Sequence, residues 1–212
     1  MMVVSKFIDI VLHVDTYLGS IILQYGIVTY GLLFLVIFVE TGLVVMPFLP
    51  GDSLLFTAGA FAGLGVLRLW VLLLVLMAAA ILGDTVNYGI GRYLGVRMFE
   101  KRHLIKKEYL EKTNEFYEKH GKKTIILARF VPIIRTFAPF VAGVGKMRYS
   151  EFLLFNVIGG VVWVSLFLLG GYFFGNLDVV RSHFSLFVLL IIFISLVPLV
   201  LEVMRHKVKK RQ

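Results

Sequence analysis

Long apolar segments follow one another along almost the whole of this 212-residue chain. Hydrophobic residues make up 59% of it and the mean hydropathy is +0.90, which is more apolar surface than a single soluble domain of this size can bury. No polar linker or proline- and serine-rich stretch separates the segments. The sequence therefore predicts an all-α integral membrane protein with one domain, residues 1–212.

The charge of the chain favours a membrane over a nucleic acid. The formal net charge is +9, but the Lys and Arg residues lie in loops beside apolar segments and in the C-terminal tail. Such charges set membrane topology, so we expect membrane lipids as partners and no nucleic acid. The chain has no cysteine, which excludes disulfides and thiolate metal sites, and its histidines form no cluster. We therefore expect neither a metal nor a cofactor.

The first third of the chain predicts an interfacial helix and a hairpin. In residues 1–25 polar side chains recur every three or four positions, which indicates an amphipathic helix lying along the membrane surface. Residues 27–67 are apolar but broken in the middle by Pro47, Pro50 and Gly51. Each arm is shorter than the roughly 20 residues that cross a bilayer. A re-entrant hairpin fits this segment better than two spans.

The remaining segments alternate between membrane and cytoplasm. The segment 124–146 is interrupted by Pro132 and Pro139 and has positive residues on both flanks, which favours a second re-entrant hairpin. The other predicted elements are a transmembrane helix at 69–91, a basic cytoplasmic segment at 92–123, and transmembrane helices at 152–177 and 184–203, the last followed by a basic tail. Three crossings place the C-terminus in the cytoplasm and the N-terminus outside.

The two halves of the chain resemble each other. Each half has a proline-broken hairpin, a spanning helix and a Gly/Tyr cluster, and the period is about 85 residues. Because one hairpin would open outward and the other to the cytoplasm, the repeat would be inverted, as in many secondary transporters. Internal similarity this weak also arises by chance.

Four charged residues stand inside the two predicted hairpins: Glu40, Asp52, Arg129 and Arg135. A charge at the bilayer centre costs roughly 2.5 to 3.5 kcal/mol, so four unpaired charges would cost about 10 kcal/mol. Two carboxylates and two guanidiniums form a neutral set if the hairpins meet. This set is either a structural clasp or a functional site. As a site, the planar arginines would bind an anionic head group, and a carboxylate would exchange a proton.

Further residues are second-rank candidates. Asp84, Asn87, Tyr88 and Arg92 are interpreted as a helix cap or interface anchor, with substrate contact as the alternative. The helix-breaking Pro47, Pro50, Gly51, Pro132 and Pro139 shape the hairpins. The small-residue spacings Gly59/Gly63 and Gly171/Gly175 indicate helix packing. Trp70 and Trp163 are interpreted as packing or interface residues.

Three motifs resemble the DedA family, also called the VTT or SNARE-associated Golgi family. They are Phe-Leu-Pro-Gly-Asp-Ser-Leu-Leu at 48–55, Gly-Asp-x-x-Asn-Tyr-x-x-Gly-Arg at 83–92, and Ala-Arg-Phe-Val-Pro-x-x-Arg-Thr-Phe-Ala-Pro-Phe-Val-Ala-Gly at 128–143. The resemblance implies a multi-pass protein of the bacterial cytoplasmic (inner) membrane with two facing re-entrant hairpins. It also implies that Glu40, Asp52, Arg129 and Arg135 are required for activity.

The same resemblance implies lipid transport. Members of the DedA family recycle undecaprenyl phosphate for cell envelope synthesis or translocate phospholipids. The resemblance therefore implies a lipid phosphate flippase as the expected function. An integral lipid phosphatase is an alternative, but Ser53 and Thr136 have no evident base, and we expect no enzyme. A non-transporting scaffold that binds anionic lipid through its basic tail is a third possibility. The particular lipid, the coupling ion and the oligomeric state stay open.

Overall fold

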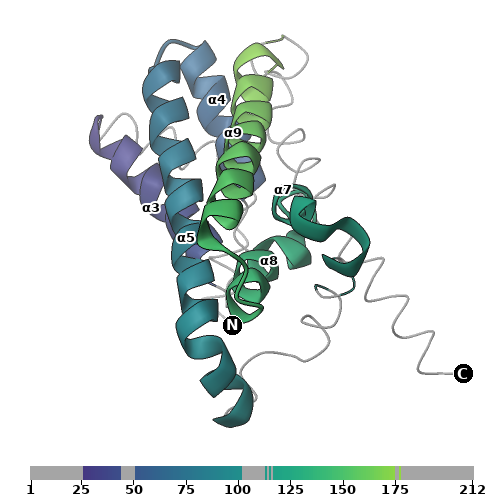
Figure 1. Cartoon of the computed structure of the whole chain (residues 1–212). Helices are drawn as coiled ribbons and strands as arrows, with labels where there is room; N and C mark the ends of the chain where they lie inside the picture. Colours follow the sequence, from purple (N-terminus) through teal and green to yellow (C-terminus); the bar gives the residue numbers. More distant parts are fainter. Residues whose placement is uncertain are drawn as a thin grey trace, which may run out of the picture. The chain divides into compact units, whose positions relative to one another are not determined.

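The computed structural model describes residues 26–43, 51–101, 113, 115, 117–174 and 177 (Figure 1). This described part is all-helical and contains no strand, which confirms the all-α part of the predicted fold class. Its elements are α3 (Val28–Gly42), α4 (Gly51–Gly63), α5 (Leu69–Lys101), the 3-10 helix η1 (Gly121–Lys123), α7 (Thr124–Ala128), α8 (Pro132–Val144) and α9 (Tyr149–Phe174).

Two of these helices are long and apolar enough to cross a membrane. They are the part Leu69–Tyr93 of α5, with 25 residues, and α9, with 26 residues. A crossing needs about 20 residues, so both predicted spans in this part of the chain coincide with a helix of sufficient length. Helix α5 continues to Lys101, ten residues past the predicted end at 91, because the Arg, Lys and Glu residues that follow are good helix formers.

The helices around the predicted hairpins are shorter. Helix α3 has 15 residues and α8 has 13, so each spans only about 20 Å at 1.5 Å per residue. Pro132 is the first residue of α8, where its missing N–H leaves no hydrogen bond unmade, and Pro139 lies inside the helix. Gly51 begins α4. The predicted amphipathic helix at 1–25, the span at 184–203, and both Pro47 and Pro50 lie outside the described residues.

The chain divides into two compact units. The first comprises Met1–Phe34, Pro50–Leu76 and Val164–Gln212, and the second comprises Leu35–Leu49 and Met77–Trp163. In the first unit, α4 and α9 touch through glycine: a Cβ atom on Gly59 would lie 2.0 Å from the Leu168 carbonyl oxygen, and one on Gly171 would lie 1.9 Å from that of Phe56. Both glycines serve helix packing, as their small-residue spacing predicts.

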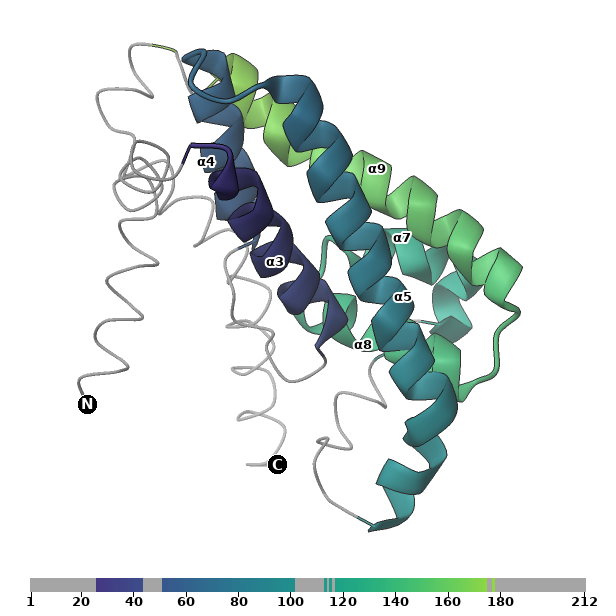
Figure 2. The ribbon, with the colours of Figure 1, turned by 90° about the vertical axis from the view of Figure 1, so that its left-hand side faces the viewer.

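The second unit is held by a similar contact between α5 and α8. A Cβ atom on Gly91 would lie 2.1 Å from the Phe140 carbonyl oxygen, and one on Gly143 would lie 2.2 Å from that of Tyr88. The ribbons of α5 and α9 also run alongside each other (Figure 2), and within this unit the Asn156 side chain of α9 donates to the Ile81 carbonyl of α5 at 3.0 Å. These contacts bring α5, α8 and α9 together around one core.

Tyr117 anchors the basic segment to this core. Its hydroxyl donates to the Ala138 carbonyl oxygen of α8 at 2.9 Å. Burial, and secondly the negative charge of Asp84, raise the pKa of the Tyr117 phenol well above its usual range. The phenol therefore keeps its proton and remains a hydrogen-bond donor.

We expect Gly143→Ala to destabilise the protein by about 1 to 3 kcal/mol, because the new methyl group would overlap the Tyr88 carbonyl and the Arg92 amide, both of them backbone. Gly31→Ala is the matched control: it lies in α3, has nothing within 4 Å of the new Cβ, and should gain up to about 1 kcal/mol of helix propensity. Thermal unfolding of the detergent-purified variants measures both. Equal stability of Gly143→Ala and the wild type would contradict the close α5–α8 contact.

Candidate functional site

Four charged side chains meet in the interior of the second unit. Glu40 comes from the end of α3, Asp84 from α5, Arg129 from the break after α7, and Arg135 from the first turn of α8. Each is at most 6% exposed. Two carboxylates and two guanidiniums make this set neutral, as the cost of burying single charges requires.

The first ion pair joins α3 to α8. An Arg135 guanidinium nitrogen donates to a Glu40 carboxylate oxygen. Because Pro132 begins α8, Arg135 stands one turn into the helix, and its backbone N–H bonds to the Val131 carbonyl oxygen at 2.8 Å. The pair therefore connects the two segments that the sequence predicts to be hairpins.

The second ion pair joins the α7–α8 break to α5. The Nη2 atom of Arg129 lies 2.6 Å from Asp84 Oδ2 and 2.6 Å from Asn156 Oδ1. The Asn156 amide nitrogen donates to the Ile81 carbonyl oxygen, which turns the amide oxygen toward the arginine. A carboxylate and an amide from two helices thus fix one guanidinium nitrogen.

The Arg129 side chain lies against a glycine surface of α9. A Cβ atom on Gly159 would lie 3.2 Å from both Cδ and Nε of Arg129, and one on Gly160 would lie 3.5 Å from Nη2. The Nε and Nη1 atoms of Arg129 are buried and have no hydrogen-bond partner among the described residues. They carry three of the five guanidinium N–H groups, so Arg129 retains donors for a further acceptor.

Trp163 lies near both arginines. Its ring centroid is 5.8 Å from the guanidinium carbon of Arg129 and 5.4 Å from that of Arg135, within the range of cation–π attraction. The side chain is fully buried. The sequence interpretation of Trp163 as an ordinary packing or interface residue missed this contact, and it missed Asn156 altogether. A polar Asn within an uncharged span is the signal that would have pointed to Asn156.

The second-rank residues on α5 do not lie at a helix end. Helix α5 continues to Lys101, so the interpretation of Asp84, Asn87, Tyr88 and Arg92 as a helix cap is wrong. Asp84 is instead the partner of Arg129. The side-chain nitrogen of Asn87 donates to two backbone oxygens, Thr41 on α3 at 3.1 Å and Thr136 on α8 at 2.8 Å. Tyr88 donates to the Met147 carbonyl and accepts from Arg92.

Asp52 belongs to the first unit. It lies in the first turn of α4, where it is half-buried and takes part in an electrostatic interaction or a hydrogen bond. Within the second unit, the set of four charges is neutral because Asp84 supplies the second carboxylate beside Glu40. Three of the four primary residues meet in this unit: Glu40, Arg129 and Arg135.

Double-mutant cycles should separate the two ion pairs. Glu40→Gln alone leaves Arg135 buried without its counter-charge, which we expect to cost about 3 to 5 kcal/mol of unfolding free energy. Adding Arg135→Gln to Glu40→Gln should restore part of that loss. The pair Asp84→Asn and Arg129→Gln should behave in the same way. In each cycle we expect a coupling free energy between the two substitutions above about 1 kcal/mol.

The crossed combination of Glu40→Gln with Arg129→Gln is the control, since these residues share no ion pair in the described structure. Its coupling, measured by the same denaturation assay, should be the smallest of the three. A crossed coupling as large as the paired ones would show that the four charges act only as a diffuse cluster.

Comparison with known proteins finds a matching family and several relatives. Residues 49–173 match the VTT domain family. Protein DedA of Escherichia coli strain K12 is 52% identical over 204 residues, which cover 94% of this chain and 93% of that protein. A membrane protein of Mycobacterium tuberculosis strain H37Rv is 45% identical over 180 residues, 81% of this chain and 77% of that protein.

A more distant relative has a similar description. Inner membrane protein YghB of Escherichia coli strain K12 is 34% identical over 158 residues, which cover 74% of this chain and 72% of that protein. No solved structure matches the chain. The match to the VTT domain covers more than half of the chain, and the relatives cover most of it. The chain therefore belongs to the DedA family of membrane proteins.

Proposed function

We propose that this protein carries a lipid phosphate across the bacterial inner membrane, with undecaprenyl phosphate, recycled for cell envelope synthesis, as the first candidate and other phospholipids as the alternative. The observation that carries the proposal is the Arg129 side chain. It is buried, it is charge-compensated by Asp84, and its Nε and Nη1 atoms have no partner in the described part of the chain. Such donors suit a phosphate oxygen.

The proposed membrane arrangement is multi-pass, with two re-entrant hairpins that face each other and a cytoplasmic C-terminus. Helices α3 and α8 are too short to cross the bilayer, which supports the hairpins. The Glu40–Arg135 pair supports a meeting of the two hairpins inside the protein, where non-helical backbone is tolerated at membrane depth.

The proposed mechanism is an exchange of anions on the arginine. Without substrate, Asp84 neutralises Arg129. When a lipid phosphate binds Arg129 in its singly ionised form, it competes with Asp84, and the displaced carboxylate takes up a proton so that the site stays neutral. Lipid binding and proton binding are then linked. No covalent step is involved, so the protein acts as a transporter and not as an enzyme.

Arg129→Lys should reduce lipid flux at least tenfold while the protein still folds and inserts. The reason is geometric: Nη2 holds two acceptors at 2.6 Å while other N–H groups remain for phosphate, and a lysine ammonium is a single point charge. The measurement is flux of a fluorescent lipid phosphate in proteoliposomes, with released inorganic phosphate assayed in parallel.

Arg68→Lys serves as the control for this substitution, because Arg68 lies exposed in the loop between α4 and α5 and should tolerate the change. Full flux with lysine at position 129 would mean that a positive charge alone suffices. Release of inorganic phosphate from the lipid by the wild type would replace the transporter with a phosphatase.

The exchange mechanism also predicts a pH dependence. Because the displaced carboxylate must be protonated, lipid affinity and flux should fall as the pH rises across roughly pH 5 to 8, the range in which a partly desolvated carboxylate titrates. Asp84→Asn carries no titrating group at this position and should bind lipid with little response to pH. Wild-type binding that is flat over this range would exclude the proton linkage and leave the transporter proposal standing.

A further inference from the structure

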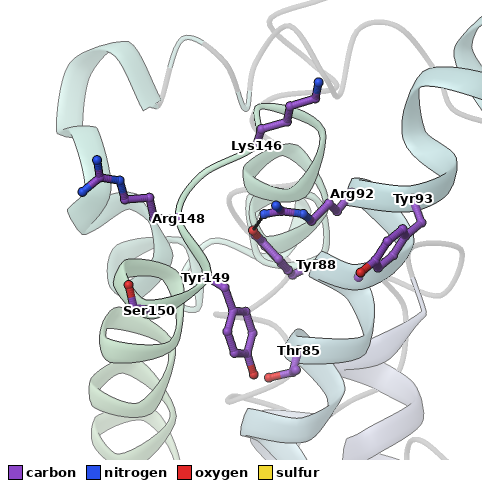
Figure 3. Close-up of a pocket in the computed structure, with 9 residues that line it drawn as sticks. Thr85, Tyr88, Arg92, Tyr93, Lys146, Arg148, Tyr149 and Ser150 are labelled. Carbon is purple, nitrogen blue, oxygen red and sulfur yellow. Dashed lines mark hydrogen bonds between the residues drawn. The ribbon is translucent and has the colours of Figure 1, made fainter.

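A second group of cations lies in the second unit, apart from the four buried charges. Arg92 on α5, with Lys146 and Arg148 on the α8–α9 turn, line a recess of about 680 Å³. Figure 3 shows Arg92 and Tyr88 on α5 facing the turn that carries Lys146. Tyr149 and Ser150 add hydroxyl groups to the lining. A recess of this volume is large enough for a small polar ligand or a lipid head group.

The lining of the recess contains three cations and no carboxylate. Arg92 donates to Tyr88 at 2.7 Å and approaches the Met147 carbonyl oxygen at 3.5 Å, both neutral partners. Glu151 follows the lining residues in sequence and interacts electrostatically with Arg148, but it forms its ion pair with Lys122 at 2.7 Å. Among the described residues, the recess therefore keeps an excess of positive charge.

The backbone of the turn carries an unusual residue. Lys146 has φ of 53°, in the left-handed region, where helix C-termini normally have glycine or asparagine. The turn itself is well formed, since the Lys146 and Met147 N–H groups bond to the Gly143 and Ala142 carbonyl oxygens at 3.0 Å each. Glycine would make this turn with less strain. Compared with glycine, the lysine adds a positive charge to the rim of the recess. Residues held in such strained backbone conformations cluster at functional sites.

The recess lies where one candidate membrane span ends and the other begins. Tyr93 is the last residue of the span in α5, and Tyr149 is the first residue of α9. Both line the recess. Tyrosines and basic residues gather at the depth of the lipid head groups, so a ligand in the recess would sit at that depth.

We propose that this recess binds a phosphate monoester, from either a membrane lipid or a soluble ester, and selects it over the zwitterionic head groups of bulk lipid. Lys146 and Arg148 extend outward from the turn in Figure 3, and rotation of these long side chains would bring them, with Arg92, to a group of nearly two negative charges. The hydroxyl groups of Tyr149 and Ser150 supply further donors. The inference rests on the proposed function for its substrate class. It adds a head-group site that is distinct from Arg129.

The test uses the purified full-length protein in phosphatidylcholine nanodiscs with labelled phosphatidic acid as the probe. The recess variant carries Arg92→Gln, Lys146→Gln and Arg148→Gln. The control variant carries Arg68→Gln, Lys119→Gln and Lys123→Gln, which remove three exposed positive charges outside the recess. We expect phosphatidic acid to bind the recess variant at least tenfold more weakly and the control less than twofold more weakly. Equal weakening of both variants, or none in the recess variant, overturns the proposal.

Lys146→Gly distinguishes lost ligand binding from lost folding. It removes the cation and relieves the left-handed strain, so its melting temperature should stay equal or rise while phosphatidic acid binds several-fold more weakly. A lysine that only shapes the turn would leave binding unchanged in this variant, and that result contradicts the proposal.

Competition identifies the source of the phosphate. Labelled phosphatidic acid is displaced with glycerol 3-phosphate and with unlabelled phosphatidic acid. If glycerol 3-phosphate needs a far higher concentration, the ligand is a lipid; if the two are equally potent, the ligand is a soluble ester. Arg129→Lys separates this inference from the proposed function, because it should reduce flux at least tenfold and keep recess binding. If the Arg129→Lys variant keeps full flux while the recess variant loses phosphatidic acid binding, the recess stands and the proposed need for an arginine at position 129 is refuted. If the Arg129→Lys variant loses flux while the recess variant binds phosphatidic acid as well as the wild type does, the recess proposal alone is refuted.

Discussion

Charge compensation in an apolar interior is the constraint on which the second unit depends. Arg129 and Arg135 are almost completely buried, and a lone charge at such depth costs several kcal/mol. Asp84 and Glu40 remove that cost only if α3, α5 and α8 hold their relative positions. The glycine contact between α5 and α8 and the two hydrogen bonds from Asn87 provide that precision. Packing and polar bonding therefore serve the same four side chains.

The sequence predicted those features that depend on local pattern. Apolar length predicted α5 and α9, and Pro132, which was predicted to interrupt the segment 124–146, lies at the break between α7 and α8. The partner of Arg129 could not be predicted in this way, because Asp52 and Asp84 are both single carboxylates in apolar surroundings, and only tertiary packing distinguishes them. Asn156 and Trp163 were missed for a related reason: their roles come from contact with residues far away in sequence.

Family membership and local chemistry support the function in different ways. The match to the VTT domain and to membrane proteins of the DedA family establishes the kind of protein. The structure adds a specific arrangement, in which one face of Arg129 is occupied by Asp84 and Asn156 while Nε and Nη1 have no bond among the described residues. A purely structural clasp would be expected to use those donors as well, since unpaired buried polar groups are costly.

The contacts of α5 also constrain how the chain can change in length. Asp84, Asn87 and Gly91 follow each other at intervals of three and four residues, so one helix surface carries the partner of Arg129, the amide bound to α3 and α8, and the glycine contact. Inserting or deleting one residue between them would rotate the following side chains by about 100° away from their partners. Along this stretch the spacing is as necessary as the residue types, so single-residue insertions should be far less tolerated than most point substitutions.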